Sequence, residues 1–256
     1  MFTFAGCQIP VTRDIEKNIK EIKKAIDWAK ENSVEIIATP ECALSGYMWK
    51  PDSVDDPRLS LVISGLEEIK KYSKETGVDI VLGTAFVDDV NHWANTQKFI
   101  VSGEVIHTHY KNIVFGEELK YYNPGTTVGS IQYKQYKIAG LICNDFWSNP
   151  ILWPDASGVL LRKLKDDGVD ILFASVNVPK ETGPEDCFFR WHVLCTEMFS
   201  MAGGWTTVVC DNPYLMEGDE YQGRTISQSG ICNPNMQWIK SREHGTDYFK
   251  QSRYDK

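Results

Sequence analysis

At residues 137–147 the chain reads KIAGLICNDFW, an apolar run that reaches Cys143 and then turns polar at once. A short apolar run that ends in this way is typical of a buried strand, which delivers one side chain to the edge of a sheet. On this stretch alone, Cys143 is equally well interpreted as a packed core thiol or as a nucleophile. The stretch therefore predicts a strand and leaves the chemistry of its cysteine open.

Two other strand-like segments also end at a reactive side chain. Residues 36–40 read IIATP and lead to Glu41, and residues 105–110 read VIHTHY and lead to Lys111. Taken singly, these residues are a surface glutamate and a solvated lysine. Taken with Cys143, they predict a cluster of an acid, an amine and a thiol at three strand ends. In such a cluster a partly desolvated carboxylate would be a usable base, and a lysine would stabilise an anionic transition state.

The remaining segments predict an α/β protein in which helices cover the sheets. Residues 2–8 are predicted to form the first strand, and residues 243–256 are expected to be a polar arm. We expect one domain over residues 1–256, because no linker-like, repeated or low-complexity tract divides it. Helices are expected at 14–31, 58–75, 155–167 and 187–202, and further strands at 34–38, 78–87, 93–102, 104–110, 130–132, 136–142, 170–176, 206–210, 224–232 and 237–240.

Composition narrows the class of protein. The formal net charge of −8 argues against a nucleic-acid surface, and no apolar run is long enough to span a bilayer. The first residues lack the pattern of a signal peptide, so we expect a cytoplasmic protein.

The cysteines and histidines do not indicate a metal site. The seven cysteines include no CxxC pair, which argues against structural zinc. His107 and His109 lie on the same side of a strand, but with no third ligand we interpret them as part of a solvated edge strand.

Three motifs, in this order, resemble the Glu-Lys-Cys triad of the nitrilase superfamily of carbon–nitrogen hydrolases. They are the Pro-Glu step at Glu41, the Tyr-Lys step at Lys111 and the Gly-x-x-Cys-x-Asp stretch around Cys143. The resemblance extends over nearly the whole chain. It implies a four-layer α-β-β-α sandwich without cofactor or metal, which associates into homo-oligomers through its helical layers. Supporting similarities lie at residues 5–8, 122–125, 189–212 and 223–234.

The same resemblance assigns roles. Glu41 is the expected base, Cys143 the nucleophile, and Lys111 with the backbone N–H of Asn144 the stabiliser of the oxyanion. A second glutamate often lies between the lysine and the Pro-Gly turn. Glu118 fits that position best, and its neighbour Glu117 is the alternative.

Residues around the nucleophile indicate the substrate class. Nitrile-cleaving members tend to have Trp directly after the nucleophile, whereas this chain has Asn144. The Cys-Asn-Asp step and Asn177 are more similar to the N-carbamoyl amino acid amidohydrolase branch. That branch continues with two arginines that hold a substrate carboxylate, but here Phe146 and Trp147 occupy these positions. We therefore expect an apolar or aromatic substrate wall at Phe146 and Trp147, to which Tyr47 contributes.

The expected function is hydrolysis of a non-peptide carbon–nitrogen bond in a small linear amide or N-carbamoyl compound through a cysteine acyl-enzyme. A nitrilase or an acyltransferase on the same triad is the alternative in the same fold. A non-catalytic binding protein or a redox-active thiol protein is the alternative of another class. The expected partners are a small-molecule substrate and further copies of the chain, with no nucleic acid or membrane. The sequence names neither the substrate nor the number of subunits.

Overall fold

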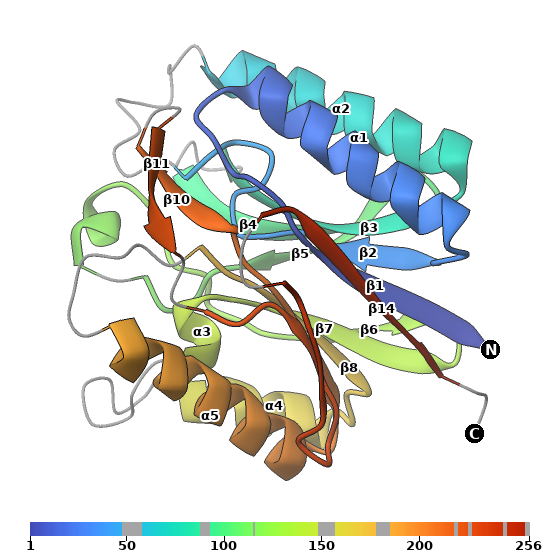
Figure 1. Ribbon diagram of the computed structural model, residues 1–256, viewed down its shortest axis with the longest axis vertical. Coiled ribbons are helices and arrows are strands. Elements are labelled where there is room, and N and C mark those ends of the chain that lie inside the picture. Colours follow the sequence, from blue (N-terminus) through green and yellow to red (C-terminus); the bar gives the residue numbers. More distant parts are fainter. Residues whose placement is uncertain are drawn as a thin grey trace.

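Two six-stranded sheets pack face to face, and a pair of helices covers the outer face of each (Figure 1). This is the four-layer sandwich that the resemblance implied, so that prediction is confirmed. The computed structural model describes residues 1–47, 58–87, 93–114, 116–147, 157–177, 185–217, 220–224, 227–242 and 245–253.

The first sheet has the order β14-β1-β2-β3-β4-β5. Strand β2 runs parallel to β1 and β3, and β3, β4 and β5 are successively antiparallel, so β2 and β5 end at the same edge. Ser102 and Gly103 join β4 to β5 with φ of 52° and 81°, as a two-residue type I′ turn requires. The strands are β1 (Phe2–Gln8), β2 (Ile36–Ala38), β3 (Asp79–Val87), β4 (Trp93–Val101), β5 (Glu104–Tyr110) and β14 (Asp247–Arg253).

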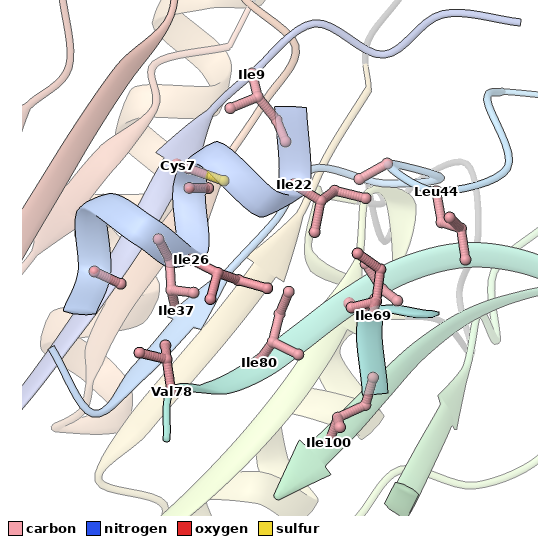
Figure 2. Packing of buried hydrophobic residues seen from close by; sticks show 14 of the residues in the cluster. Cys7, Ile9, Ile22, Ile26, Ile37, Leu44, Ile69, Val78, Ile80 and Ile100 are labelled. Carbon is pink, nitrogen blue, oxygen red and sulfur yellow. The ribbon is translucent and has the colours of Figure 1, made fainter. Parts of the chain in front are cut away.

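Helices α1 (Ile15–Glu31) and α2 (Arg58–Thr76) cover this sheet. Asp14 begins α1 by accepting a hydrogen bond from the backbone N–H of Lys17 at 3.1 Å. The apolar face of α1 is buried together with that of α2 against β2 and β3 (Figure 2). Burial of this apolar area stabilises the outer half of the sandwich.

The second sheet has the order β13-β12-β9-β8-β7-β6, with β7, β8 and β9 parallel. Helices α4 (Ser157–Asp166) and α5 (Glu185–Gly203) cover it. None of the helices in the described ranges has both the length and the apolar composition to cross a membrane. The strands are β6 (Ser130–Tyr133), β7 (Tyr136–Ile142), β8 (Ile171–Ser175), β9 (Thr206–Cys210), β12 (Gly230–Cys232) and β13 (Trp238–Lys240).

A polar bridge ties the two sheets together beneath their carboxyl-terminal edges. The side-chain amide of Gln97 donates to the Ser175 hydroxyl at 2.7 Å, and that hydroxyl donates to the Thr39 carbonyl oxygen at 2.8 Å. All three residues are buried. Because hydrogen bonds are stronger in a buried setting, this bridge fixes the two sheets relative to each other.

The structure differs from the sequence prediction in three places. Residues 224–232 are not one strand: a hairpin of β10 (Tyr214–Glu217) and β11 (Glu220–Arg224) precedes β12. Short helices α3 (Asn144–Trp147) and η1 (Gly116–Lys120) were not predicted. The polar arm expected at 243–256 contains the edge strand β14, which pairs antiparallel with β1. An edge strand needs little apolar surface, and β14 buries only the Phe249 side chain fully, which explains its polar composition.

Gly83 allows β3 to approach the turn that carries Glu41. A Cβ atom at this position would lie 2.1 Å from the Pro40 carbonyl oxygen. We expect Gly83→Ala to lower the free energy of unfolding by about 1–3 kcal/mol, because the turn must move. Chemical denaturation measures this. Gly158→Ala is the control, since nothing lies within 4 Å of a Cβ there and alanine favours α4. Equal stability changes for both variants would contradict the prediction.

Candidate active site

Glu41, Lys111 and Cys143 each follow the carboxyl end of a strand, namely β2, β5 and β7. The three residues are 0%, 1% and 9% exposed, respectively. Backbone hydrogen bonds hold the three positions: the N–H of Glu41 donates to Val176, that of Lys111 to Asn95, and that of Cys143 to Ser175. Because Glu41 follows a strand of the first sheet and Val176 follows a strand of the second, the face-to-face packing brings the three residues together.

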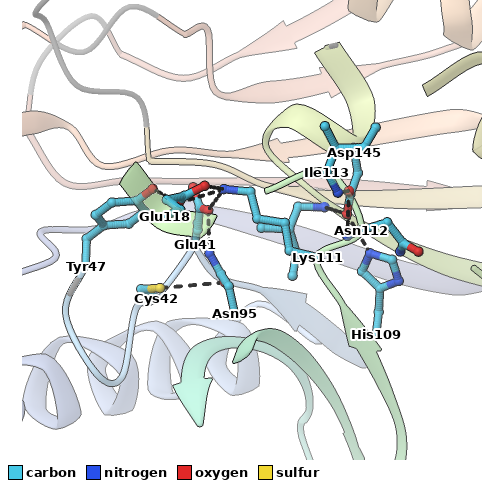
Figure 3. A network of polar contacts seen from close by, with 11 residues as sticks. Glu41, Cys42, Tyr47, Asn95, His109, Lys111, Asn112, Ile113, Glu118 and Asp145 are labelled. Carbon is cyan, nitrogen blue, oxygen red and sulfur yellow. Dashed lines mark hydrogen bonds and ion pairs between the residues drawn. The ribbon is translucent and has the colours of Figure 1, made fainter. Parts of the chain in front are cut away.

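The carboxylate of Glu41 has two unlike oxygens. Oε1 accepts from Lys111 Nζ at 2.9 Å and from Asn95 Nδ2 at 2.7 Å (Figure 3). Oε2 is buried and has no hydrogen-bond partner among the described residues. Burial raises the pKa of Glu41, the Lys111 ammonium opposes this rise, and the negative charge of Glu118 adds to it. Glu41 therefore presents one oxygen with free lone pairs and raised basicity.

Lys111 lies between two carboxylates. Besides Glu41, its ammonium contacts both oxygens of Glu118, at 3.1 and 3.2 Å, and the Tyr47 hydroxyl donates to Glu118 as well (Figure 3). Burial alone would lower the pKa of Lys111, but the negative charges around it raise the pKa well above its ordinary value. Lys111 is therefore a permanent, fixed cation at neutral pH.

Cys143 occupies a tight turn from β7 into α3. Its φ is 46°, a left-handed conformation that residues other than glycine adopt rarely and that is found preferentially at functional sites. Burial raises the pKa of its thiol, as do Glu41, Glu118 and Asp211, whereas Lys111 lowers it. The thiol accordingly holds its proton at neutral pH and needs a base to become a nucleophile.

Two residues at the site were missed by sequence reasoning. Asn95, which donates to Glu41, lies in β4 next to Thr96 and Gln97. All three residues are polar and buried, and this polar run within a strand is the sequence feature that could have indicated the site. Asp145 was quoted only as part of a motif. Its buried carboxylate lies 2.8 Å from His109 Nε2, so the interpretation of His109 as part of a solvated strand is wrong.

The other predicted residues are placed as follows. Asn144 begins α3 and is half-buried, and Asn177 is buried two residues after the end of β8. Tyr47 is half-buried, and its hydroxyl binds Glu118. Phe146 is not a substrate wall, because it is fully buried and packs edge-on against Phe199 of α5. The side chains of Trp147 and Glu117 lie outside the described part of the structure.

The site offers acid–base and nucleophilic groups. Within the described ranges, no three His, Cys, Asp or Glu side chains are grouped so that they could hold a metal ion. A thiol, a carboxylate with a free oxygen and a buried cation are the groups that covalent acyl transfer uses.

Comparison with known proteins gives a family and several relatives. A model of the carbon–nitrogen hydrolase family matches residues 3–246. Two glutamine-dependent NAD(+) synthetases are 25% and 27% identical to this chain: that of Acinetobacter baylyi over 54% of this chain and 26% of its own length, and that of Synechocystis sp. over 67% and 33%. The chain thus spans a third or less of these curated relatives.

Among solved structures, an amidase from Nesterenkonia sp. AN1 superposes with a TM-score of 0.79 and 16% identity. The match covers 99% of this chain and 94% of the amidase. At this identity the likeness shows a shared fold. That structure is of a mutant whose active-site cysteine carries the product of a Michael addition of acrylamide.

Substitutions of two residues near Glu41 are expected to shift its pKa in opposite directions. Asn95→Leu removes a hydrogen-bond donor that favours the carboxylate, so the pKa of Glu41 should rise further. Glu118→Gln removes a negative charge, so the pKa should fall. Carboxyl ¹³C NMR titration, with the Glu41 signal assigned by its loss in Glu41→Gln, measures both. The exposed, remote Asn235→Leu serves as the control. Shifts of the same sign in the two variants would contradict this account.

Proposed function

The chain belongs to the carbon–nitrogen hydrolase family, and on that premise we propose that it hydrolyses a non-peptide carbon–nitrogen bond in a small linear amide or N-carbamoyl compound, through an acyl-enzyme on Cys143. One observation carries the proposal. Lys111 and Asn95 hold Glu41 Oε1, so the buried Oε2 is left for proton transfer. A protonated thiol and an unengaged carboxylate oxygen are complementary parts of one base-assisted attack.

In the first half-reaction, Glu41 Oε2 takes the thiol proton as Cys143 Sγ bonds to the amide or carbamoyl carbon. The carbonyl oxygen becomes an oxyanion, which the Lys111 ammonium and the backbone N–H of Asn144 stabilise. As the tetrahedral intermediate collapses, the carbon–nitrogen bond breaks and the leaving nitrogen takes the proton from Glu41. Ammonia or an amine departs, and a thioester or S-carbamoyl group stays on Cys143.

In the second half-reaction, Glu41 takes a proton from water, which attacks the same carbon. The carbon–sulfur bond then breaks, and the sulfur regains its proton from Glu41. An amide yields a carboxylic acid, whereas an N-carbamoyl compound yields carbamic acid, which decomposes to carbon dioxide and ammonia. Glu118 contributes by holding Lys111 between two carboxylates, which keeps the ammonium at the oxyanion position in both half-reactions.

The residues near the nucleophile support the proposed substrate class. Asn144 after Cys143 favours amides over nitriles, by the resemblance set out above. Both curated relatives are glutamine-dependent, which makes the side-chain amide of glutamine a specific member of the linear amides to test. A nitrilase, an acyltransferase or an unreactive thiol protein would each give a different product pattern with the same substrates.

Intact-mass analysis tests the proposal directly. The protein is incubated with simple aliphatic amides, glutamine, N-carbamoyl amino acids and nitriles, while ammonia and amine release are measured. We expect an acyl or carbamoyl adduct on Cys143, and we expect Cys143→Ala to lower turnover by at least about 10³-fold because the nucleophile is lost. Cys232→Ala, which removes another buried thiol, is the matched control. Full ammonia release by Cys143→Ala would sink the proposal.

We also propose that the protein forms a homo-oligomer through α5. Helix α5 lies on the outside of the second sheet (Figure 1). It carries a stripe of exposed apolar side chains at a spacing of three and four residues, which would otherwise stay in water. Contiguous exposed apolar surface of this kind marks association sites. The stripe consists of Trp191, Leu194, Met198 and Met201.

Charge on the α5 stripe should prevent association. We expect the wild-type protein to elute as an oligomer and the double variant Leu194→Glu with Met198→Glu to elute as a smaller species, because burying two carboxylates without partners is unfavourable. Size-exclusion chromatography with light scattering gives the mass. Ile239→Glu, at an exposed position on β13, is the control. A monomeric wild-type protein would refute the oligomer.

A further inference from the structure

Asp145 is a fully buried carboxylate two residues after the nucleophile. Its Oδ1 accepts hydrogen bonds from the backbone N–H groups of Asn112 at 2.8 Å and Ile113 at 2.7 Å (Figure 3). Its Oδ2 lies 2.8 Å from His109 Nε2 and 3.3 Å from the backbone N–H of Ile142. Four donors therefore converge on one side chain, and a carboxylate is the group that can accept from all of them.

These donors belong to two different sheets. His109 lies on β5 of the first sheet, and Asn112 and Ile113 directly follow Lys111, whereas Ile142 and Asp145 flank Cys143 at the end of β7 in the second sheet. The carboxylate is thus a direct bond between the segment that carries the cation and the turn that carries the thiol. His109 takes part as a donor, which requires the proton on its Nε2.

The backbone of Lys111 has few other anchors. Its N–H donates to the Asn95 carbonyl oxygen at 2.8 Å, and its own carbonyl oxygen accepts from Gly125 at 2.8 Å. Both contacts hold Lys111 within its own part of the fold, and neither involves the Cys143 turn. Asp145 alone among these contacts relates Lys111 to the nucleophile. A small displacement matters here, because an ammonium must lie within hydrogen-bond reach of the oxyanion that forms.

We propose that Asp145, supported by His109, is a positioning residue that sets the Lys111 ammonium at the Cys143 thiol across the boundary between the sheets. The inference rests on the proposed roles of Lys111 and Cys143 and adds a residue that touches neither substrate nor thiol. It also explains why His109 is buried on an edge strand: its imidazole completes the carboxylate's set of donors.

The electrostatics of the thiol provide a readout that needs no substrate. Glu41, Glu118 and Asp211 raise the pKa of Cys143, and Lys111 is the cation that lowers it. If Lys111 moves away, the thiolate fraction at neutral pH must fall, and alkylation of Cys143 must slow. A change in overall stability alone would not shift the pH profile of alkylation in the folded protein.

The chain supplies a matched control carboxylate in Asp79. It also joins two segments, since Oδ1 accepts from the backbone N–H of Ser102 at 2.8 Å and Oδ2 from the Tyr133 hydroxyl at 2.6 Å. Asp79 begins β3, at the end of the strand away from the Glu41 turn. Asp79→Asn therefore replaces the same kind of bridging carboxylate by an amide and leaves Lys111 in place.

The experiment measures the iodoacetamide alkylation rate of Cys143 against pH, with peptide mass mapping to separate it from the other cysteines. We expect Asp145→Asn to slow alkylation near neutral pH by about tenfold, the effect of a thiol pKa raised by about one unit. His109→Leu should act in the same direction but less, and His109→Gln, which keeps a donor, should restore the wild-type profile. Asp79→Asn should have no effect.

A Lys111→Met background distinguishes positioning of Lys111 by Asp145 from a local effect of Asp145 on the Cys143 thiol. In a Lys111→Met background we expect Asp145→Asn to cause no further slowing, because the cation is already gone. Slowing by the same factor in both backgrounds, or a wild-type profile for Asp145→Asn, would overturn the inference. If Asp145→Asn does not fold, His109→Leu and its rescue by His109→Gln decide the question in the same way. Failure of wild-type turnover would refute the proposed function and leave this result intact.

Discussion

The contact between the Lys111 ammonium and two carboxylates is the interaction on which the site depends. An ammonium withdrawn from water loses several kcal/mol of solvation, and only close opposite charges and hydrogen bonds compensate for this. Glu41 and Glu118 supply both. One cation shared between two acids also leaves a surplus of negative charge. Burial and the negative charge of Glu118 raise the pKa of Glu41, whereas the two carboxylates outweigh the effect of burial on Lys111 and keep it charged.

The sandwich allows this arrangement because the strand ends of its two sheets lie at the same edge. β2 and β5 deliver the acid and the amine from one sheet, and β7 delivers the thiol from the other. The Gln97–Ser175–Thr39 bridge and the Glu41–Val176 bond connect the sheets immediately beneath the site. Reactive groups on rigid strand ends are held more precisely than groups on loops alone.

Strand ends were predictable from sequence because an apolar run followed at once by a polar residue is a local pattern. Glu41, Lys111 and Cys143 were predicted in this way, and the resemblance supplied the prediction of Glu118. Asn95, Asp145 and the role of His109 were not found, because their contacts join residues 36 to 54 positions apart. Phe146 was misplaced for a related reason. An aromatic residue next to a nucleophile suits a substrate wall or a core equally well, and only the position of α5 decides between them.

Pairing of β14 with β1 has a consequence for biosynthesis. Thr3 and Ser252, whose hydroxyls are hydrogen-bonded across these strands, are 249 positions apart in the chain. During translation β1 emerges before β14, and its outer edge stays unpaired until residues 247–253 have left the ribosome. An unpaired edge strand is a template for association with other chains. The outer edge of β1 therefore stays exposed until β14 pairs with it, which makes completion of this sheet a slow, non-local step of folding.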